Sequence, residues 1–148
     1  MRGNLYIRNI FVACLWTAVP HGAFATGAGP AREMQADAAA CIAAASAGDD
    51  GRIIDACGEL IGNEKTARAD RIKALIARGA AFDRQDKTDQ AIDDYDTVLL
   101  LDPTLADVFN ARGEIRRKRG SFPKALADFG MAIKLNPQYA SALNNRGL

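Results

Sequence analysis

Histidine and tryptophan are nearly absent from this 148-residue sequence, in which each occurs once, as His21 and Trp16. Most zinc sites and most nucleophile–base pairs of hydrolases use an imidazole, so a domain without His21 would lack that ligand or base. The sequence also lacks a basic excess, because 19 lysines and arginines face 18 acidic residues. No basic run is interleaved with aromatic residues, so we expect no nucleic-acid partner.

A long hydrophobic run is missing too. The most apolar stretch, Ile10 to Val19, is far shorter than the roughly 20 residues that span a bilayer. It follows a polar start with two arginines and precedes Ala23-Phe24-Ala25, the small-x-small pattern of a signal peptidase site. The sequence therefore predicts a signal peptide over residues 1–25, cleaved after Ala25, and a periplasmic or secreted protein with no stable membrane insertion. The alternatives are an uncleaved membrane anchor and a lipoprotein modified at Cys14.

Cleavage after Ala25 would change the chemistry that the chain has available. It would remove His21, Trp16 and Cys14, and the loss of two arginines would change the formal charge from +1 to −1. No spacing of acidic residues in the remainder singles out a catalytic pair. We therefore predict no enzymatic activity, no metal site and no cofactor.

Two cysteines, Cys41 and Cys57, remain after the predicted cleavage. The sequence GDDG between them, at residues 48–51, is a strong turn signal, with helical patterns on both sides. Each cysteine lies eight residues from Asp49, so a tight antiparallel hairpin would bring both to the same height. An even cysteine count in an exported protein favours a disulfide. The alternative is two small buried thiols.

The second half of the chain repeats itself every 34 residues. Gly147 aligns with Gly113 and Gly79, and the preceding arginine recurs with each glycine. The other half of the unit repeats in the same register, with the pairs Ala91 and Ala125, Asp94 and Asp128, Tyr95 and Phe129, and Pro103 and Pro137. Such a period indicates a repeat protein whose unit is one supersecondary element.

Small residues recur on both sides of the turn inside each unit. Two antiparallel helices can approach closely where neither carries a bulky side chain. We therefore expect Gly79 to face Ala91, and Gly113 to face Ala125. Apolar residues at spacings of three and four should fill the layer between the helices.

These residues resemble the tetratricopeptide repeat family, whose helix-turn-helix unit carries a large apolar residue, Gly-x-x-aromatic, then Ala, an aromatic, Ala and Pro. Residues 72–105 match this unit at Leu75, Gly79, Phe82, Ala91, Tyr95, Val98 and Pro103. Residues 106–139 match it at Phe109, Gly113, Ala125, Phe129, Ala132 and Pro137, with Arg116 at an aromatic position. The resemblance implies an all-α fold, a right-handed superhelical stack of antiparallel helix pairs, or α-solenoid.

Other segments flank the two complete units. We expect a flexible linker over residues 26–35, a degenerate leading hairpin over residues 36–68, and a partial unit or capping helix over residues 140–148. Arg116 in place of an aromatic residue predicts a wetter or more loosely packed seam. An open apolar side at the last segment would permit a homodimer.

In the family's geometry the first helix of each pair lines a concave groove, which is the default binding site. On that geometry the inward positions are Lys73, Ile76, Ala80, Asp107, Asn110, Glu114, Arg117, Ser141 and Asn144. The resemblance therefore implies a non-catalytic scaffold or adaptor in the bacterial envelope, which binds a peptide or helix of another protein in this groove. The alternative is a helical enzyme or enzyme fragment in which the repeats are only a scaffold.

Charged residues also recur at the 34-residue period. Arg78 and Arg112 stand before the repeated glycines, and Asp94 and Asp128 follow them by sixteen residues. Because both signs repeat together, we expect structural ion pairs between Arg78 and Asp94 and between Arg112 and Asp128. The alternative is a row of guanidinium groups that binds an acidic ligand.

Overall fold

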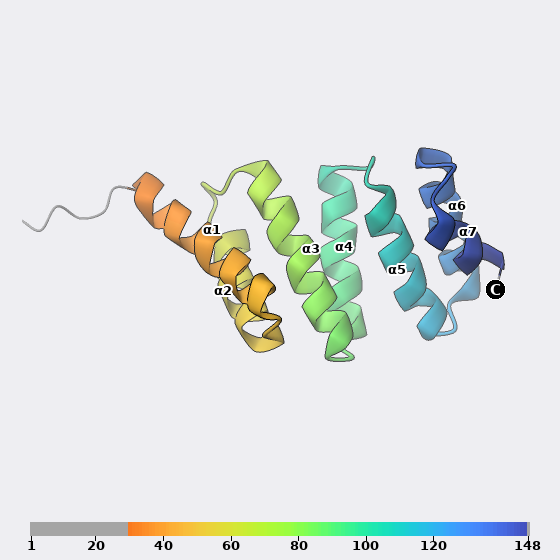
Figure 1. Cartoon of the computed structure of the whole chain (residues 1–148), viewed down its shortest axis with the longest axis horizontal. Helices are drawn as coiled ribbons and strands as arrows, with labels where there is room; N and C mark the ends of the chain where they lie inside the picture. The colour runs from red at the N-terminus through yellow and green to blue at the C-terminus, as the bar shows by residue number, and fades with distance from the viewer. Residues whose placement is uncertain (1–29, 148) are drawn as a thin grey trace, which may run out of the picture.

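The computed structural model of this chain describes residues 30–147, with side chains from residue 37 onward. This range forms only helices and short turns: α1 (Pro30–Ala47), α2 (Asp50–Gly62), α3 (Arg68–Arg84), α4 (Thr88–Leu101), α5 (Ala106–Lys118), α6 (Phe122–Leu135) and α7 (Ala140–Gly147). The helices stand side by side along one axis, with α1 and α7 at opposite ends (Figure 1). The predicted all-α stack of antiparallel helix pairs is confirmed. The predicted signal peptide lies outside the described residues and stays a prediction.

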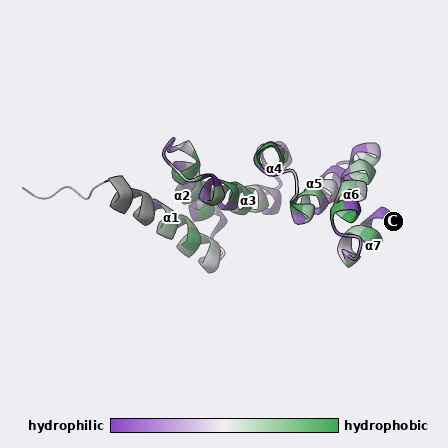
Figure 2. Cartoon of the chain, turned by 90° about the horizontal axis from the view of Figure 1, so that it is seen from above, coloured by the Kyte–Doolittle hydropathy of each residue, from purple (hydrophilic) through white to green (hydrophobic). Residues whose placement is uncertain are grey.

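The helices form two layers. Seen from above, α2, α4 and α6 lie on one side and α1, α3, α5 and α7 on the other (Figure 2). In the second layer α1 and α7 lie further forward than α3 and α5, so that layer presents a concave face. Between the layers lies the apolar core, whose most enclosed members include Val98, Ile115 and Phe129. None of the helices in residues 30–147 has the length and apolar character that crossing a bilayer requires.

Two predicted boundaries differ from the structure. Helix α1 begins at Pro30, within the expected linker, because proline fits the first turn of a helix and the residues after it favour helix. Helix α3 begins at Arg68, four residues before the repeat unit predicted over residues 72–105. Before it, the Thr66 hydroxyl donates to the Leu60 carbonyl at 2.7 Å, and Arg71 donates to the Asn63 carbonyl at 2.8 Å. These bonds satisfy two carbonyl groups at the end of α2. The later units have a proline after the corresponding helix, and this hairpin does not.

The turn inside each regular pair needs one residue in the left-handed region. Gly120 has φ +74°, and Asp86, which lies 34 residues earlier, has φ +57°. In both turns the N–H of the next residue donates to the carbonyl five residues back, at 2.9 Å for Lys87 and 2.8 Å for Ser121. Aspartate is one of the few residues besides glycine that adopt this conformation, so the two turns share one geometry.

The repeated glycines lie against aromatic rings. A Cβ atom placed on Gly113 would be 2.6 Å from Cε1 of Phe129, and one on Gly79 would be 3.2 Å from Cε1 of Tyr95. The atoms nearest to each glycine therefore belong to the ring and to the aspartate before it, rather than to the alanine that the sequence analysis placed opposite the glycine. In an antiparallel pair the position opposite the glycine belongs to the ring, which follows the alanine by four residues. Burial raises the pKa of Tyr95 to about 12, so this ring packs as a neutral phenol.

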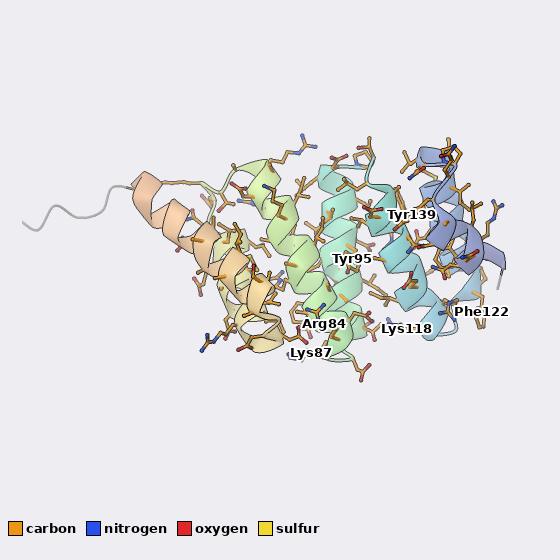
Figure 3. The ribbon with its side chains drawn as sticks, viewed as in Figure 1. Arg84, Lys87, Tyr95, Lys118, Phe122 and Tyr139 are labelled. Atoms are coloured by element: carbon orange, nitrogen blue, oxygen red, sulfur yellow. A yellow bond between two sulfur atoms is a disulfide. The ribbon has the colours of Figure 1, made fainter. Side chains whose placement is uncertain are left out.

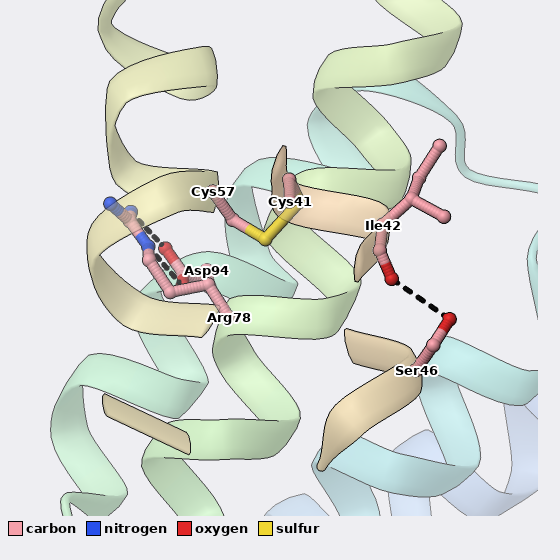
Figure 4. The surroundings of a disulfide bond; sticks show 6 residues. All are labelled: Cys41, Ile42, Ser46, Cys57, Arg78 and Asp94. Carbon is pink, nitrogen blue, oxygen red and sulfur yellow. Dashed lines mark hydrogen bonds and ion pairs between the residues drawn. A yellow bond between two sulfur atoms is a disulfide. The ribbon is translucent and has the colours of Figure 1, made fainter. Parts of the chain in front are cut away.

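A disulfide joins Cys41 on α1 to Cys57 on α2, with Cα atoms 4.7 Å apart (Figure 4). Cys57 is fully buried, in an apolar cluster that also contains Ile53, Leu60 and Ala74. The alanine-rich α1 has little side-chain volume to bury against α2. The covalent bond closes a 16-residue separation and contributes about 3 kcal/mol in the chain-entropy account, which offsets the small core of this hairpin.

Replacing Gly113 by alanine should destabilise the fold by about 1–3 kcal/mol, because the added methyl group would overlap the buried ring of Phe129. Gly130→Ala is the matched control, since Gly130 is also helical but a Cβ there meets nothing within 4 Å. That change should stabilise by about 0.5–1 kcal/mol through helix propensity. Urea unfolding followed by circular dichroism measures both, and equal effects would contradict the close contact.

Candidate functional site

The concave face is built from α1, α3, α5 and α7, the layer that lies toward the viewer in Figure 1. All nine predicted groove residues lie on these helices, three on α3, four on α5 and two on α7. Lys73, Asp107, Ser141 and Asn144 are exposed, and Ile76, Ala80, Glu114 and Arg117 are half-buried. The remaining one, Asn110, is only 5% exposed, so the expectation that it faces a ligand is wrong.

Asn110 is buried because it belongs to a hydrogen-bond network between α5 and α7. Its amide donates to Glu114 Oε1 at 2.8 Å, and its oxygen accepts from Asn145 at 3.1 Å. Asn145 also donates to Glu114 Oε1 at 2.8 Å. The network ties the last two inner helices together. It uses Asn145 rather than its predicted neighbour Asn144.

A cavity of about 360 Å³ opens between α1 and α3 at the other end of the groove. Its walls are apolar, with Cys41, Ile42, Leu60, Ala74 and Ala77 among the lining residues. Asp70 and Lys73, whose charged groups are 3.5 Å apart, also line it. Of the predicted groove residues only Lys73 lies here. The sequence did not reveal the cavity, because α1 lies outside the 34-residue register.

The α5–α7 end of the groove is polar instead. Tyr139 lies just before α7 (Figure 3). Two causes raise the pKa of Tyr139: its partial burial, which has the larger effect, and a hydrogen bond to the Asp107 carboxylate. The phenol therefore stays protonated at neutral pH. Together with Asp107 and Glu114 it gives this half of the groove an acidic, hydrogen-bonding character.

Ion pairs join the helices behind the groove. Arg78 donates two hydrogen bonds to Asp94, at 2.9 and 2.7 Å, and Arg112 donates two to Asp128, at 3.1 and 2.6 Å. Both aspartates are almost fully buried. These guanidinium groups are bound by the protein's own carboxylates. The geometry therefore favours the structural interpretation over a row of sites for an acidic ligand.

Arg116 extends one of these pairs into a cluster. It bonds Asp128 at 2.8 Å, and both Arg112 and Arg116 contact Asp96 on α4 of the preceding unit. Burial opposes the charge of Arg112, but the bonds to Asp128 and Asp96 outweigh it and raise the pKa of Arg112. Ion pairs of Arg116 with Asp128 and Asp96 thus hold the seam at the position where the family usually has an aromatic residue. Among residues 37–147 no group of three potential metal ligands gathers.

Comparison with known proteins gives a consistent picture. Residues 113–148 match the family described as TPR repeat. The human mitochondrial import receptor subunit TOM70 is 31% identical over 97 residues, which are 56% of this chain and 16% of the receptor. The chain therefore spans a small part of that relative.

Solved domains share the fold. The Arabidopsis OM64 TPR domain has a TM-score of 0.68 at 22% identity, over 78% of this chain and 92% of that domain. The second TPR domain of human RPAP3, in complex with the HSP70 peptide SGPTIEEVD, has a TM-score of 0.67 at 20% identity, over 77% and 95%.

Removing the carboxylate of Asp128 should destabilise the fold by about 3–5 kcal/mol, because Asp128→Ala leaves two largely buried arginines without this partner. The matched control is Asp89→Ala. The exposed carboxylate of Asp89 pairs with Arg119. Its removal should cost less than about 1 kcal/mol. Thermal unfolding of both variants measures the difference, and similar losses would argue against a structural role for the cluster.

Proposed function

This chain is a tetratricopeptide repeat protein, and we propose on that premise that it is a non-catalytic scaffold that holds a segment of another protein in its concave groove. The observation that carries the proposal is the contrast between the two halves of the groove. The α1–α3 half offers an apolar cavity of about 360 Å³, and the α5–α7 half offers carboxylates and a phenol.

This contrast defines the ligand that fits. Ligand sites are usually concave and mainly apolar, with a few polar groups that fix orientation. An aliphatic side chain of an extended peptide or helix would enter the cavity beside Ile42, where it loses contact with water. A basic side chain further along the same segment would meet Asp107 and Glu114. The proposed ligand is therefore a segment with one aliphatic and one basic anchor.

The relatives support the binding of a segment of another protein, but they do not indicate the sequence of that segment. The RPAP3 domain was solved with a peptide that carries three acidic residues, SGPTIEEVD. The acidic groups at the α5–α7 end of the present groove would repel such a segment. Groove chemistry, rather than the shared fold, therefore sets the proposed preference.

An array of synthetic peptides in which the aliphatic and basic residues vary independently tests this function. Binders should carry both, and Ile42→Arg should weaken binding at least tenfold because it fills the mouth of the cavity. Asp107→Lys should shift the preference from basic toward acidic segments.

The matched control for these variants is Leu100→Arg, at an exposed leucine on α4 in the opposite layer. It should leave binding unchanged. Peptides that bind all three variants as well as the original chain would refute a role for the groove.

We also propose that the protein works outside the cytoplasm, in the bacterial envelope or beyond. Residues 1–25 carry the signal-peptide pattern, and a disulfide such as Cys41–Cys57 persists in oxidising compartments. N-terminal sequencing of the protein isolated from its host should begin at Thr26. Thiol titration of the denatured, unreduced protein should then find no free cysteine. An intact Met1 or two free thiols would overturn this setting.

A further inference from the structure

Helix α1 forms one wall of the apolar cavity in the groove. Half of the residues that line this cavity belong to α1, among them Cys41 and Ile42, and most of the others belong to α3. Cys41 is also one end of the disulfide to Cys57 (Figure 4). The bond that fixes α1 therefore lies in the wall of the proposed binding site.

The side chains of α1 give it little other hold on its neighbours. In residues 37–47 only Cys41 and Ala44 are buried, and Ile42, the one large apolar side chain of this segment, is 63% exposed. The Ser46 hydroxyl donates to the Ile42 carbonyl at 2.9 Å, within α1 itself. Most of the stability of a helix in a protein comes from the packing of its apolar face. The position of α1 against α3 therefore depends on the disulfide.

Helix α2 is held independently of the disulfide. Ile53 and Leu60 are buried in the apolar cluster that also contains Ala74 of α3. The Asp50 carboxylate accepts two hydrogen bonds from Arg84 at the end of α3, at 2.8 and 2.6 Å. Loss of the covalent bond should therefore release α1 and leave α2 in place on α3.

We propose that the disulfide is a redox switch for the groove: its reduction releases α1, removes one wall of the cavity and weakens binding of the aliphatic anchor. This inference rests on the proposed function, because it concerns the same cavity. After reduction, an aliphatic side chain beside α3 would face water on the side that α1 had covered. It would lose much of the favourable free energy that burial of its apolar surface provides.

The proposed reductant is a dithiol. One of its thiolates attacks a sulfur of the disulfide and forms a mixed disulfide, and the other cysteine leaves as a thiolate that takes up a proton. The second thiol of the reductant then attacks the mixed disulfide, forms a ring disulfide and frees the first cysteine. Two electrons and two protons pass from the reductant to the two cysteines. An oxidised dithiol reverses these steps.

Binding and reduction are coupled in both directions. If the oxidised chain binds a segment tenfold more tightly than the reduced chain, the bound segment makes the disulfide tenfold harder to reduce. For a two-electron couple a tenfold change corresponds to about 30 mV. A saturating peptide should therefore lower the reduction potential of the Cys41–Cys57 pair by at least about 30 mV.

The test uses the full chain with Cys14→Ala, so that only Cys41 and Cys57 titrate. Mixtures of reduced and oxidised dithiothreitol set their state, and hydrogen exchange measured by mass spectrometry follows each helix. In the reduced chain the amides of α1 should exchange at least tenfold faster, whereas α3 to α6 should keep their protection. A peptide from the array that carries both anchors should bind the reduced chain at least tenfold more weakly.

Cys41→Ala with Cys57→Ala gives a chain without the switch. It should bind this peptide as weakly as the reduced chain does, and dithiothreitol should not change its binding. Equal exchange of α1 in both redox states would overturn the proposal, as would equal binding of the peptide. Loss of protection in every helix would also overturn it, because reduction would then unfold the chain rather than release α1.

A failure of the proposed function gives a different result. The oxidised chain would then bind no peptide that carries both anchors, and redox control of binding would fall with the function. If only the switch fails, the oxidised chain binds such peptides and the reduced chain binds them equally well.

Discussion

The distance between the two helices of a unit depends on one contact, the glycine that lies against an aromatic ring. At Gly113 the ring of Phe129 occupies the space that any Cβ would need. The residue before the glycine, Arg112, and the residue before the ring, Asp128, form the two-bond ion pair. Close packing thus brings the charged groups within bonding distance. The same arrangement recurs at Gly79, with Arg78 and Asp94 as its ion pair.

The 34-residue period predicts most of this architecture because it reports which positions pack together. It places arginine and aspartate sixteen residues apart and proline between pairs. It does not report which side chain lies opposite which, because that depends on the antiparallel register across the turn. For this reason the sequence analysis expected each glycine to face an alanine, whereas its nearest neighbour is the ring. Asp96, which completes the cluster around Arg112, has no counterpart at the period.

For the same reason, the sequence predicted which helices line the groove but not the cavity or the burial of Asn110. The positions on α3, α5 and α7 follow from the repeat, and they do lie on the concave layer. The cavity beside Ile42 depends on α1, which has no place in the register. Asn110 was misplaced because burial of a polar residue depends on a partner from another unit, Asn145. Periodicity therefore predicts the helices that line a groove better than it predicts the state of each side chain.

The disulfide also decides how the stack comes apart. Units in a solenoid contact only their neighbours, so heat or force can peel them away from either end. The covalent tie between α1 and α2 keeps these two helices together, so the first hairpin separates from α3 as one unit, while α7 is held only by non-covalent contacts in the described chain. Unfolding one helix at a time is therefore open to α7 but closed to α1, which cannot leave without α2.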